Sequence, residues 1–171
     1  MIRQNIDLIE PTADLESEFL TMAKEFQAAG DERYKSALEN FSAYLEQLSK
    51  YSLGIDLKPG LVPQTEFWLV DSGKIVASSR LRHRLTPALE REGGHIGYAV
   101  RPSERRKGYG TLILALTLEK AKNLGLKKLL VTCDTDNTGS AKIIEKNRGK
   151  LAGYEISDRS GKQISRYWLE L

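Results

Sequence analysis

The stretch from His95 to Thr111, HIGYAVRPSERRKGYGT, decides the fold. Its first residues predict a short apolar strand that ends before Pro102, and a basic turn and a long helix follow. Two glycines, Gly108 and Gly110, let the backbone at the helix start approach an anion closely, where the first helical amides lack intrahelical acceptors. Positive charge comes from three consecutive residues, Arg105, Arg106 and Lys107. The pattern favours a phosphate-binding turn, although an ordinary turn beside a solvated basic patch would contain the same residues.

The six residues from Arg105 to Gly110, RRKGYG, match the (R/Q)-x-x-G-x-(G/A) signature of the GNAT superfamily of N-acyltransferases. The motif follows a predicted strand and opens a predicted helix, as it does in that family. Further along, the strand LKKLLVTCD and the segment from Asn137 to Ser140 resemble the next cofactor-contacting segment of the family. The resemblance covers roughly residues 65 to 171. It implies an α/β (α+β) fold, in which a mixed, mostly antiparallel sheet of about six to seven strands is flanked by about four helices.

In GNAT proteins the glycine turn binds the pyrophosphate of coenzyme A, and the preceding strand pairs with the pantetheine arm. By this resemblance, backbone groups of Tyr98, Ala99 and Val100 hold the pantetheine and polarise the thioester carbonyl. Asn137 resembles the residue that hydrogen-bonds to the pantetheine arm, and it could also cap the short helix that follows; Ser140 lies one helical turn further on. The residues expected to contact the pyrophosphate are Arg105, Arg106, Lys107, Gly108, Tyr109, Gly110 and Thr111.

Acyl transfer to an amine also needs a group that takes the amine proton and an acid for the leaving thiolate. Several GNAT enzymes place the base on the first motif strand and a tyrosine acid in the last helix. The positions that correspond here are Gly94 and Ile144, so both expected side chains are missing. Two residues with the predicted strand parity of Gly94 remain as weak catalytic candidates, Glu92 and Tyr98.

Other titratable residues are weaker candidates. His95 is predicted to point away from the face of Gly94, which favours a structural role, and Tyr154 and Glu66 have no positional support. Cys133 follows an apolar run and is expected to be a buried small residue. Because the two histidines and the single cysteine show no ligand spacing, we expect no metal site.

The length, composition and net charge of the chain are those of an ordinary globular protein. The chain of 171 residues is expected to form one domain, 1–171, with 40% hydrophobic and 29% charged residues. No run approaches the ~20 apolar residues that a membrane helix needs, and the N-terminus lacks the layout of a signal peptide. We therefore expect a cytoplasmic protein without membrane contact. A net charge of +3 is too small to argue for nucleic acid.

The N-terminal third predicts a strand over residues 2 to 9 and two helices. The first begins near Leu15 with Asp14 as its N-cap and ends at Gly30. The second, capped by Asp31, carries an apolar stripe that is expected to be core: Tyr34, Leu38, Phe41, Leu45 and Leu48. Residues 51 to 64 contain two glycines and two prolines, which predicts an ordered loop.

The rest of the chain predicts strands and helices in alternation. A hairpin is expected over residues 66–70 and 74–85, with Asp71-Ser72-Gly73 at its turn. After the helix that begins at Gly110 and stops at Gly125, the remaining expected elements are a central strand over 127–133, a short helix over 138–146, and strands near 150–156 and 163–170.

Three arginines alternate along the second strand of the hairpin: Arg80, Arg82 and Arg84. Because they have the same parity, we expect them on one face of the sheet. A solvated strand face is the simpler interpretation, and a site for an anionic acceptor or an acidic partner is the functional one. His83, on the apolar parity, is expected to be a hydrogen-bonded core histidine.

These observations predict an N-acetyltransferase that moves an acetyl or similar short acyl group from acetyl-CoA to a primary amine of a small molecule or peptide. Three alternatives stay open: a GNAT-fold module that binds coenzyme A for regulation without turnover, a nucleotide-phosphate enzyme, and a nucleic-acid-binding protein. The last two are disfavoured, since no G-x-x-x-x-G-K-(S/T) motif is present and the basic residues are few. The acceptor and a homodimeric assembly are left open.

Overall fold

The computed structural model describes residues 5–171. Within them the chain forms seven strands, and their bounds are β1 Ile6–Ile9, β2 Gln64–Asp71, β3 Lys74–Arg82, β4 Ile96–Val100, β5 Lys128–Asp134, β6 Lys150–Ile156 and β7 Gln163–Glu170. The helices are α1 Glu16–Ala28, α2 Lys35–Glu39, α3 Phe41–Leu53, α4 Pro87–Arg91, α5 Tyr109–Asn123 and α6 Thr138–Lys146, with two short 3-10 turns, Ala13–Leu15 and Pro102–Glu104. The start of the predicted first strand, residues 2 to 4, lies outside the described residues.

The strands form two antiparallel sheets, with the orders β1-β2-β3-β4 and β5-β7-β6. β4 and β5 adjoin at one end, where the His95 amide donates to the Leu130 carbonyl at 2.7 Å. The Leu130 amide in turn donates to Nδ1 of His95 at 2.9 Å. His95 thus has the structural role that its strand parity predicted, and it links the two sheets where their facing strands begin to diverge.

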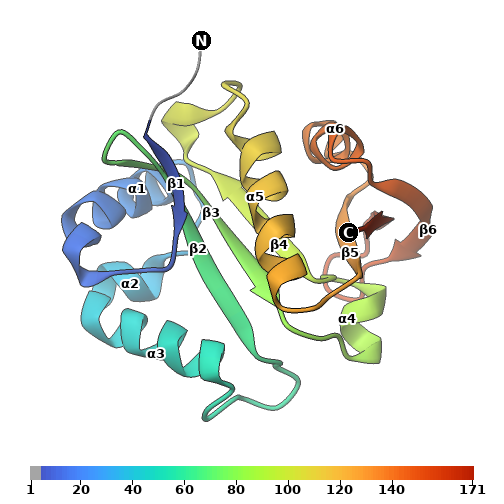
Figure 1. The fold of residues 1–171 in the computed structure, drawn as a ribbon, viewed down its shortest axis with the longest axis horizontal. Coiled ribbons are helices and arrows are strands. Elements are labelled where there is room, and N and C mark those ends of the chain that lie inside the picture. Colours follow the sequence, from blue (N-terminus) through green and yellow to red (C-terminus); the bar gives the residue numbers. More distant parts are fainter. Residues whose placement is uncertain (1–4) are drawn as a thin grey trace.

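Helices cover both faces of the four-stranded sheet. Figure 1 shows α1, α2 and α3 on one side and α5 on the other, with α6 over the three-stranded sheet. The first side is packed with aromatic rings: Phe19 stacks on Trp68 at a centroid distance of 4.5 Å, and Tyr34 and Phe41 are buried beside them. The predicted aromatic stripe is therefore core. On the α5 side, Ile113 and Leu114 are fully buried.

The second predicted helix is interrupted, so one long helix becomes α2 and α3. Asn40 takes an extended conformation, with φ −156° and ψ 95°, and its side chain accepts a hydrogen bond from the Ala43 amide to cap α3. The predicted caps at Asp14 and Asp31 are also wrong. Thr12 caps the 3-10 turn before α1, and Asp31 accepts from the backbone and side chain of Arg33 instead. Helix α3 extends to Leu53, which shortens the predicted loop.

Several other predictions are confirmed. The Ser72–Gly73 turn joins β2 to β3 with positive φ at both residues, 52° and 83°, as a tight hairpin requires. The bounds predicted for α6, β6 and β7 agree with the structure. In the described part of the chain, no helix has both the length and the apolar character needed to cross a membrane.

Candidate functional site

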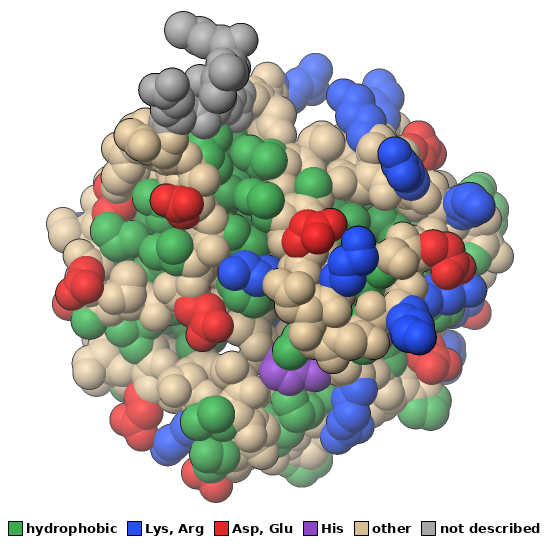
Figure 2. All heavy atoms as spheres, viewed as in Figure 1, with side chains coloured by type: hydrophobic (Ala, Val, Ile, Leu, Met, Phe, Trp, Pro, Cys, Tyr) green, Lys and Arg blue, Asp and Glu red, His purple; other side chains and the backbone are tan. Residues whose placement is uncertain are grey.

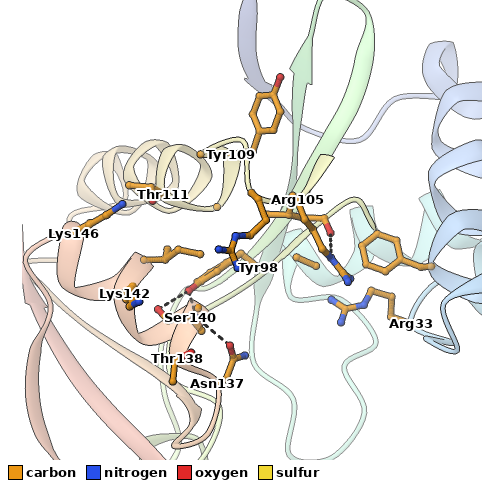
Figure 3. Close-up of a pocket in the computed structure, with 18 residues that line it drawn as sticks. Arg33, Tyr98, Arg105, Tyr109, Thr111, Asn137, Thr138, Ser140, Lys142 and Lys146 are labelled. Atoms are coloured by element: carbon orange, nitrogen blue, oxygen red, sulfur yellow. Dashed lines mark hydrogen bonds between the residues drawn. The ribbon is translucent and has the colours of Figure 1, made fainter. Parts of the chain in front are cut away.

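A cavity of about 690 Å³ opens where the end of β4 meets the N-terminal ends of α5 and α6 (Figure 3). Phe26 of α1 and Arg33 of the loop after it close the side nearest the N-terminal helices. The cavity brings together every residue predicted to bind the cofactor except Lys107. The full lining is Phe26, Arg33, Tyr98, Ala99, Val100, Arg105, Arg106, Gly108, Tyr109, Gly110, Thr111, Asn137, Thr138, Gly139, Ser140, Lys142, Ile143 and Lys146.

The two glycines of the turn have different physical roles. Gly108 is the N-cap of α5 and has φ 86°, a conformation that residues with a Cβ rarely adopt. Gly110 lies within the first turn, and a Cβ on it would come within 2.5 Å of Cδ1 of Ile143. The first glycine therefore shapes the turn, and the second lets α5 and α6 pack closely at the cavity.

The cavity is positively charged at the start of α5. The amides of the first helical turn precede the first intrahelical bond, from Leu112 to the Gly108 carbonyl, so they lack helical acceptors. Basic side chains from two elements line the same cavity: Arg105, Arg106, Lys142 and Lys146. Figure 2 shows basic side chains gathered at the upper right of the molecule, over the N-terminal end of α5 and over α6. An anion here would meet both amides and cations.

Two predicted residues direct their side chains elsewhere. The ammonium group of Lys107 lies 2.8 Å from a carboxylate oxygen of Glu104, which also contacts Lys74. The hydrogen bonds from these two lysines lower the pKa of Glu104. The hydroxyl of Tyr109 donates to Asp71 at 2.5 Å, and Figure 3 shows its ring pointing away from the other labelled residues.

On the opposite wall of the cavity, Tyr98 reaches from β4 to α6. Its hydroxyl lies 2.7 Å from Oγ of Ser140. The Ser140 amide donates to the side chain of Asn137 at 3.0 Å, so Asn137 caps α6. Burial raises the pKa of Tyr98 to about 12, against a partial lowering by the bond to Ser140. This hydroxyl therefore remains protonated at neutral pH.

A sequence model of the Acetyltransferase (GNAT) family matches residues 26–149, more than half of the chain. The chain belongs to the GNAT acetyltransferase family. A search of curated proteins finds no match. The fold is that of solved GNAT acetyltransferases, which differ from this chain at most positions.

Three of these solved structures illustrate the likeness. The ribosomal-protein α-N-acetyltransferase RimL in complex with coenzyme A is 12% identical, with a TM-score of 0.74, and the alignment covers 100% of this chain and 97% of that one. RimJ of Mycobacterium smegmatis, in complex with a CoA disulfide, is 15% identical, with a TM-score of 0.75 and coverages of 96% and 81%. The microcin C7 self-immunity acetyltransferase MccE, in complex with acetyl-CoA and AMP, is 15% identical, with a TM-score of 0.70 and coverages of 98% and 93%.

Gly94, at the position where several GNAT enzymes place a glutamate or histidine base, cannot accept a side chain. Gly94 has φ +61°, and a Cβ there would lie 2.4 Å from the Leu130 carbonyl oxygen. It precedes β4, which begins only at Ile96. The position of the tyrosine acid, Ile144, is fully buried in the core. Both positions are therefore structural in this GNAT protein.

The remaining candidates are spread over the molecule. Glu92 was predicted to lie on the strand that contains Tyr98, but it is the C-cap of α4. Its carboxylate accepts from the Ser157 hydroxyl at 2.6 Å. Glu66 is buried beneath α3, and burial raises its pKa. Tyr154 is 53% exposed on β6. Among these and Tyr98, only Tyr98 lines the cavity. Within residues 5–171 no group of three or more acidic, histidine or cysteine side chains is arranged to hold a metal ion.

Five lining residues lie outside the segments that the sequence motifs indicated. Lys142, Ile143 and Lys146 lie on the predicted last helix, and the i, i+4 spacing of the two lysines beside the Asn137 segment could have revealed them. Phe26 and Arg33 come from a segment distant in sequence, and no local pattern relates them to β4. Only the packing of α1 on the sheet brings them to the cavity.

Proposed function

We propose that this GNAT protein binds acetyl-CoA in the cavity and transfers the acetyl group to a primary amine. One observation carries the proposal: the glycine turn, the N-terminal end of α5 and four basic side chains meet at one end of a cavity that continues along β4. A pyrophosphate is the part of coenzyme A whose charge suits that end. The RimL and MccE structures, which hold coenzyme A and acetyl-CoA, support this ligand.

The pantetheine arm would run along the edge of β4 that β5 leaves uncovered. The Arg101 amide donates to Val76 of β3, and backbone groups of successive residues alternate in direction along a strand. Because the backbone amide of Arg101 faces β3, the backbone groups of Val100 and Tyr98 face away from β3. Consistent with this, the Val100 carbonyl accepts from Nε of Arg105 at 3.4 Å, on the cavity side. This edge offers hydrogen-bonding groups to an extended amide-containing arm.

In the reaction the amine nitrogen attacks the thioester carbonyl, a C–N bond forms, and the C–S bond breaks to release a thiolate. The amine loses a proton to the solvent, and the thiolate gains one. We assign the second proton transfer to Tyr98, whose hydroxyl is protonated and faces the cavity beside Ser140. Proximity and orientation on the β4 edge supply the remaining acceleration without a carboxylate at Gly94.

A second candidate, a coenzyme A-binding module without turnover, is favoured by the closed position at Gly94. The two functions are separated by an assay that follows release of free coenzyme A thiol from acetyl-CoA in the presence of a panel of primary amines. We expect amine-dependent release, and binding without release would favour the module instead.

The charge of the turn is tested in the same assay with a double variant, Arg105→Ala with Arg106→Ala. The matched control is Lys122→Ala with Lys127→Ala, which removes two exposed charges far from the cavity. The KM for acetyl-CoA should rise at least about tenfold in the first and stay unchanged in the second. Equal KM values in the two variants would count against the phosphate assignment.

A further inference from the structure

Two arginines of β3, Arg80 and Arg82, lie on the sheet face that carries α1 to α3. Arg80 is paired with Glu66 on β2 and with Gly97 on β4. Ala99, two residues beyond Gly97 on the same face of β4, lines the cavity. With strands about 5 Å apart and residues of one face about 7 Å apart, the arginines border the place where an amine must reach the thioester.

The space above this part of the sheet is open. A Cβ on Gly97 would find no atom within 4 Å. The helices reach the neighbouring position of β3, where the Tyr34 hydroxyl contacts Ser78, but the Arg80 side chain is 46% exposed. A small molecule placed over Gly97 would therefore have the acetyl donor on one side and Arg80 on the other.

The charge of these arginines is poorly balanced. Arg82 donates to two backbone carbonyls, of Gly93 at 3.3 Å and of Gly94 at 2.9 Å, and among residues 5–171 it makes no ion pair. Burial and then the nearby charges of Arg80 and Arg159 lower the pKa of Arg82 to about 10. Arg159 comes from the turn between β6 and β7, where the Ser157 hydroxyl donates to Glu92, the residue next to Gly93. Two elements, β3 and this turn, therefore bring positive charge together.

The nearest carboxylate neutralises little of this charge. Glu66 lies 3.7 Å from Nε of Arg80, which is a long ion pair, and its second partner, the Tyr44 hydroxyl, is 3.4 Å away. The side chain of Glu66 is only 4% exposed, so it is not available to a ligand above Gly97. The cluster is therefore incomplete without an anion, and a guanidinium group suits an oxyanion with two lone pairs.

We propose that Arg80, Arg82 and Arg159 bind an oxyanion of the acceptor, so that the substrate is a small primary amine that also carries a carboxylate or a phosphate. The inference rests on the proposed acetyl transfer and adds the class of acceptor. It explains why arginines alternate on this strand, which the cofactor site does not require.

The first test compares amines that differ only in the anionic group. Amino acids are paired with their carboxamides, and aminoalkyl phosphates with the corresponding amino alcohols, at saturating acetyl-CoA and constant ionic strength. We expect kcat/KM for the anionic member to exceed that of its neutral partner at least about tenfold. The two sets of pairs distinguish carboxylate from phosphate. Acetylation of neutral amines at equal or higher rates would overturn the inference and leave the proposed function intact.

Variants locate the effect. Arg80→Gln and Arg159→Gln should each raise the KM for the anionic amine about tenfold with little change in kcat, and Lys122→Gln is the control of equal charge. Arg82 is left in place because it holds the Gly93 and Gly94 carbonyls. A KM for the anionic amine that is unchanged in both arginine variants would overturn the assignment.

A second measurement does not need turnover. Sodium phosphate and sodium acetate are titrated into the protein saturated with coenzyme A, so that the pyrophosphate site is already filled, and the arginine Nε–H resonances are followed by NMR. Saturable shifts of Arg80 and Arg82 that weaken in Arg159→Gln support the anion site. The absence of any saturable shift with either anion overturns it, while loss of coenzyme A binding itself would contradict the proposed function.

Discussion

The hydroxyl of Tyr98 and the side-chain oxygen of Ser140 lie 2.7 Å apart across the cavity, and they join the β4 wall to the start of α6. The same serine is held by its amide to the side chain of Asn137. A chain of three residues thus fixes a protonated phenol beside the expected path of the pantetheine arm. In the proposed reaction this phenol is the proton donor, since the position of the family's tyrosine acid, Ile144, is part of the core here.

Replacing Tyr98 with phenylalanine should lower kcat about a hundredfold while the KM for acetyl-CoA changes little, because the phenol would act only on the leaving thiolate. Since the pKa of Tyr98 is about 12, the phenol stays protonated between pH 8 and 10. The pH dependence of kcat over this range should therefore be the same in the wild type and in the variant. Steady-state kinetics with any accepted amine measure both. A kcat within twofold of the parent would remove Tyr98 from the mechanism.

Gly94 should not tolerate even a methyl group. Gly94→Ala places a Cβ against the Leu130 carbonyl at a left-handed φ, and we expect a loss of about 2 kcal/mol or more in the free energy of unfolding. Gly97→Ala is the matched control, since its Cβ would meet nothing within 4 Å. Urea denaturation compares the two. Equal stabilities would show that the junction of β4 and β5 can rearrange.

His95 should make the fold sensitive to mild acid. Burial lowers its pKa, with a smaller contribution from Arg82, and its neutral Nδ1 accepts from the Leu130 amide. The unfolded chain therefore binds more protons below the ordinary pKa of about 6.5. The stabilisation by neutral His95 is complete above that pH and is lost as the pH falls below it.

His95→Asn should cost about 1 to 3 kcal/mol at pH 8, because the Leu130 amide loses its acceptor, and part of the loss of stability between pH 7 and pH 5 should disappear. His83→Asn is the comparison: the Nε2 of His83 lies 2.7 Å from the Thr65 hydroxyl, and within residues 5–171 no backbone amide donates to its ring. Denaturation curves across this pH range give the result. If the free energy of unfolding depended on pH in the same way in the wild type and in His95→Asn, His95 would not be the source of the acid sensitivity.

Arg101 ties α1 to the end of β4. Its buried guanidinium contacts Glu18 at 2.5 Å and Glu25 at 2.7 Å. Arg101→Met should lower the free energy of unfolding by about 3 kcal/mol, since two carboxylates lose their partner. In Arg91→Met, which removes an exposed pair with Asp158, the expected loss is below about 1 kcal/mol. Thermal or urea unfolding would contradict this account if both variants lost the same stability.

The Arg101–Glu25 pair gives a second pH effect. Burial tends to raise the pKa of Glu25, but hydrogen bonds from Ser103 and Arg101 outweigh it, and the net pKa is lowered. The stabilisation is therefore complete above the ordinary pKa of 4.5 and is lost as the pH falls further. In Arg101→Met, the free energy of unfolding should therefore fall less steeply below pH 4.5 than it does in the wild type.

Much of the fold could be predicted because its boundaries are marked by residues with strong local preferences. Gly108 starts α5, Gly125 follows its end, and the pair Ser72–Gly73 closes the hairpin. Along a strand, alternate side chains point to the same face of the sheet, which is why the sequence could place Arg80 and Arg82 on one face. The prediction for Arg84 was less accurate, because β3 ends at Arg82.

The errors arose where tertiary contacts override a local pattern or a local signal was overlooked. The apolar stripe continues through Asn40, so the break between α2 and α3 was not apparent. Helix α4 was missed although Thr86 and Pro87 are a typical N-cap and first residue, and the Thr86 side chain does accept from the Leu89 amide. That helix displaced Glu92 from the predicted strand.

At the site, the residues of the motif were predictable because their chemistry depends on backbone conformation and sequence spacing. The role of Lys107 could not be judged from the motif, since the partner of its side chain, Glu104, is set by the 3-10 turn. The contributions of Phe26 and Arg33 depend on how α1 packs across the sheet.

The central claim is that the glycine turn of this GNAT protein holds the pyrophosphate of acetyl-CoA. The most direct test is calorimetric titration of the wild-type protein with acetyl-CoA and with S-acetylpantetheine, which has the thioester and the arm but no phosphate. We expect acetyl-CoA to bind at least about a hundredfold more tightly, with an affinity that falls as salt is added. Equal affinities, or no binding of acetyl-CoA to the folded protein, would contradict the claim.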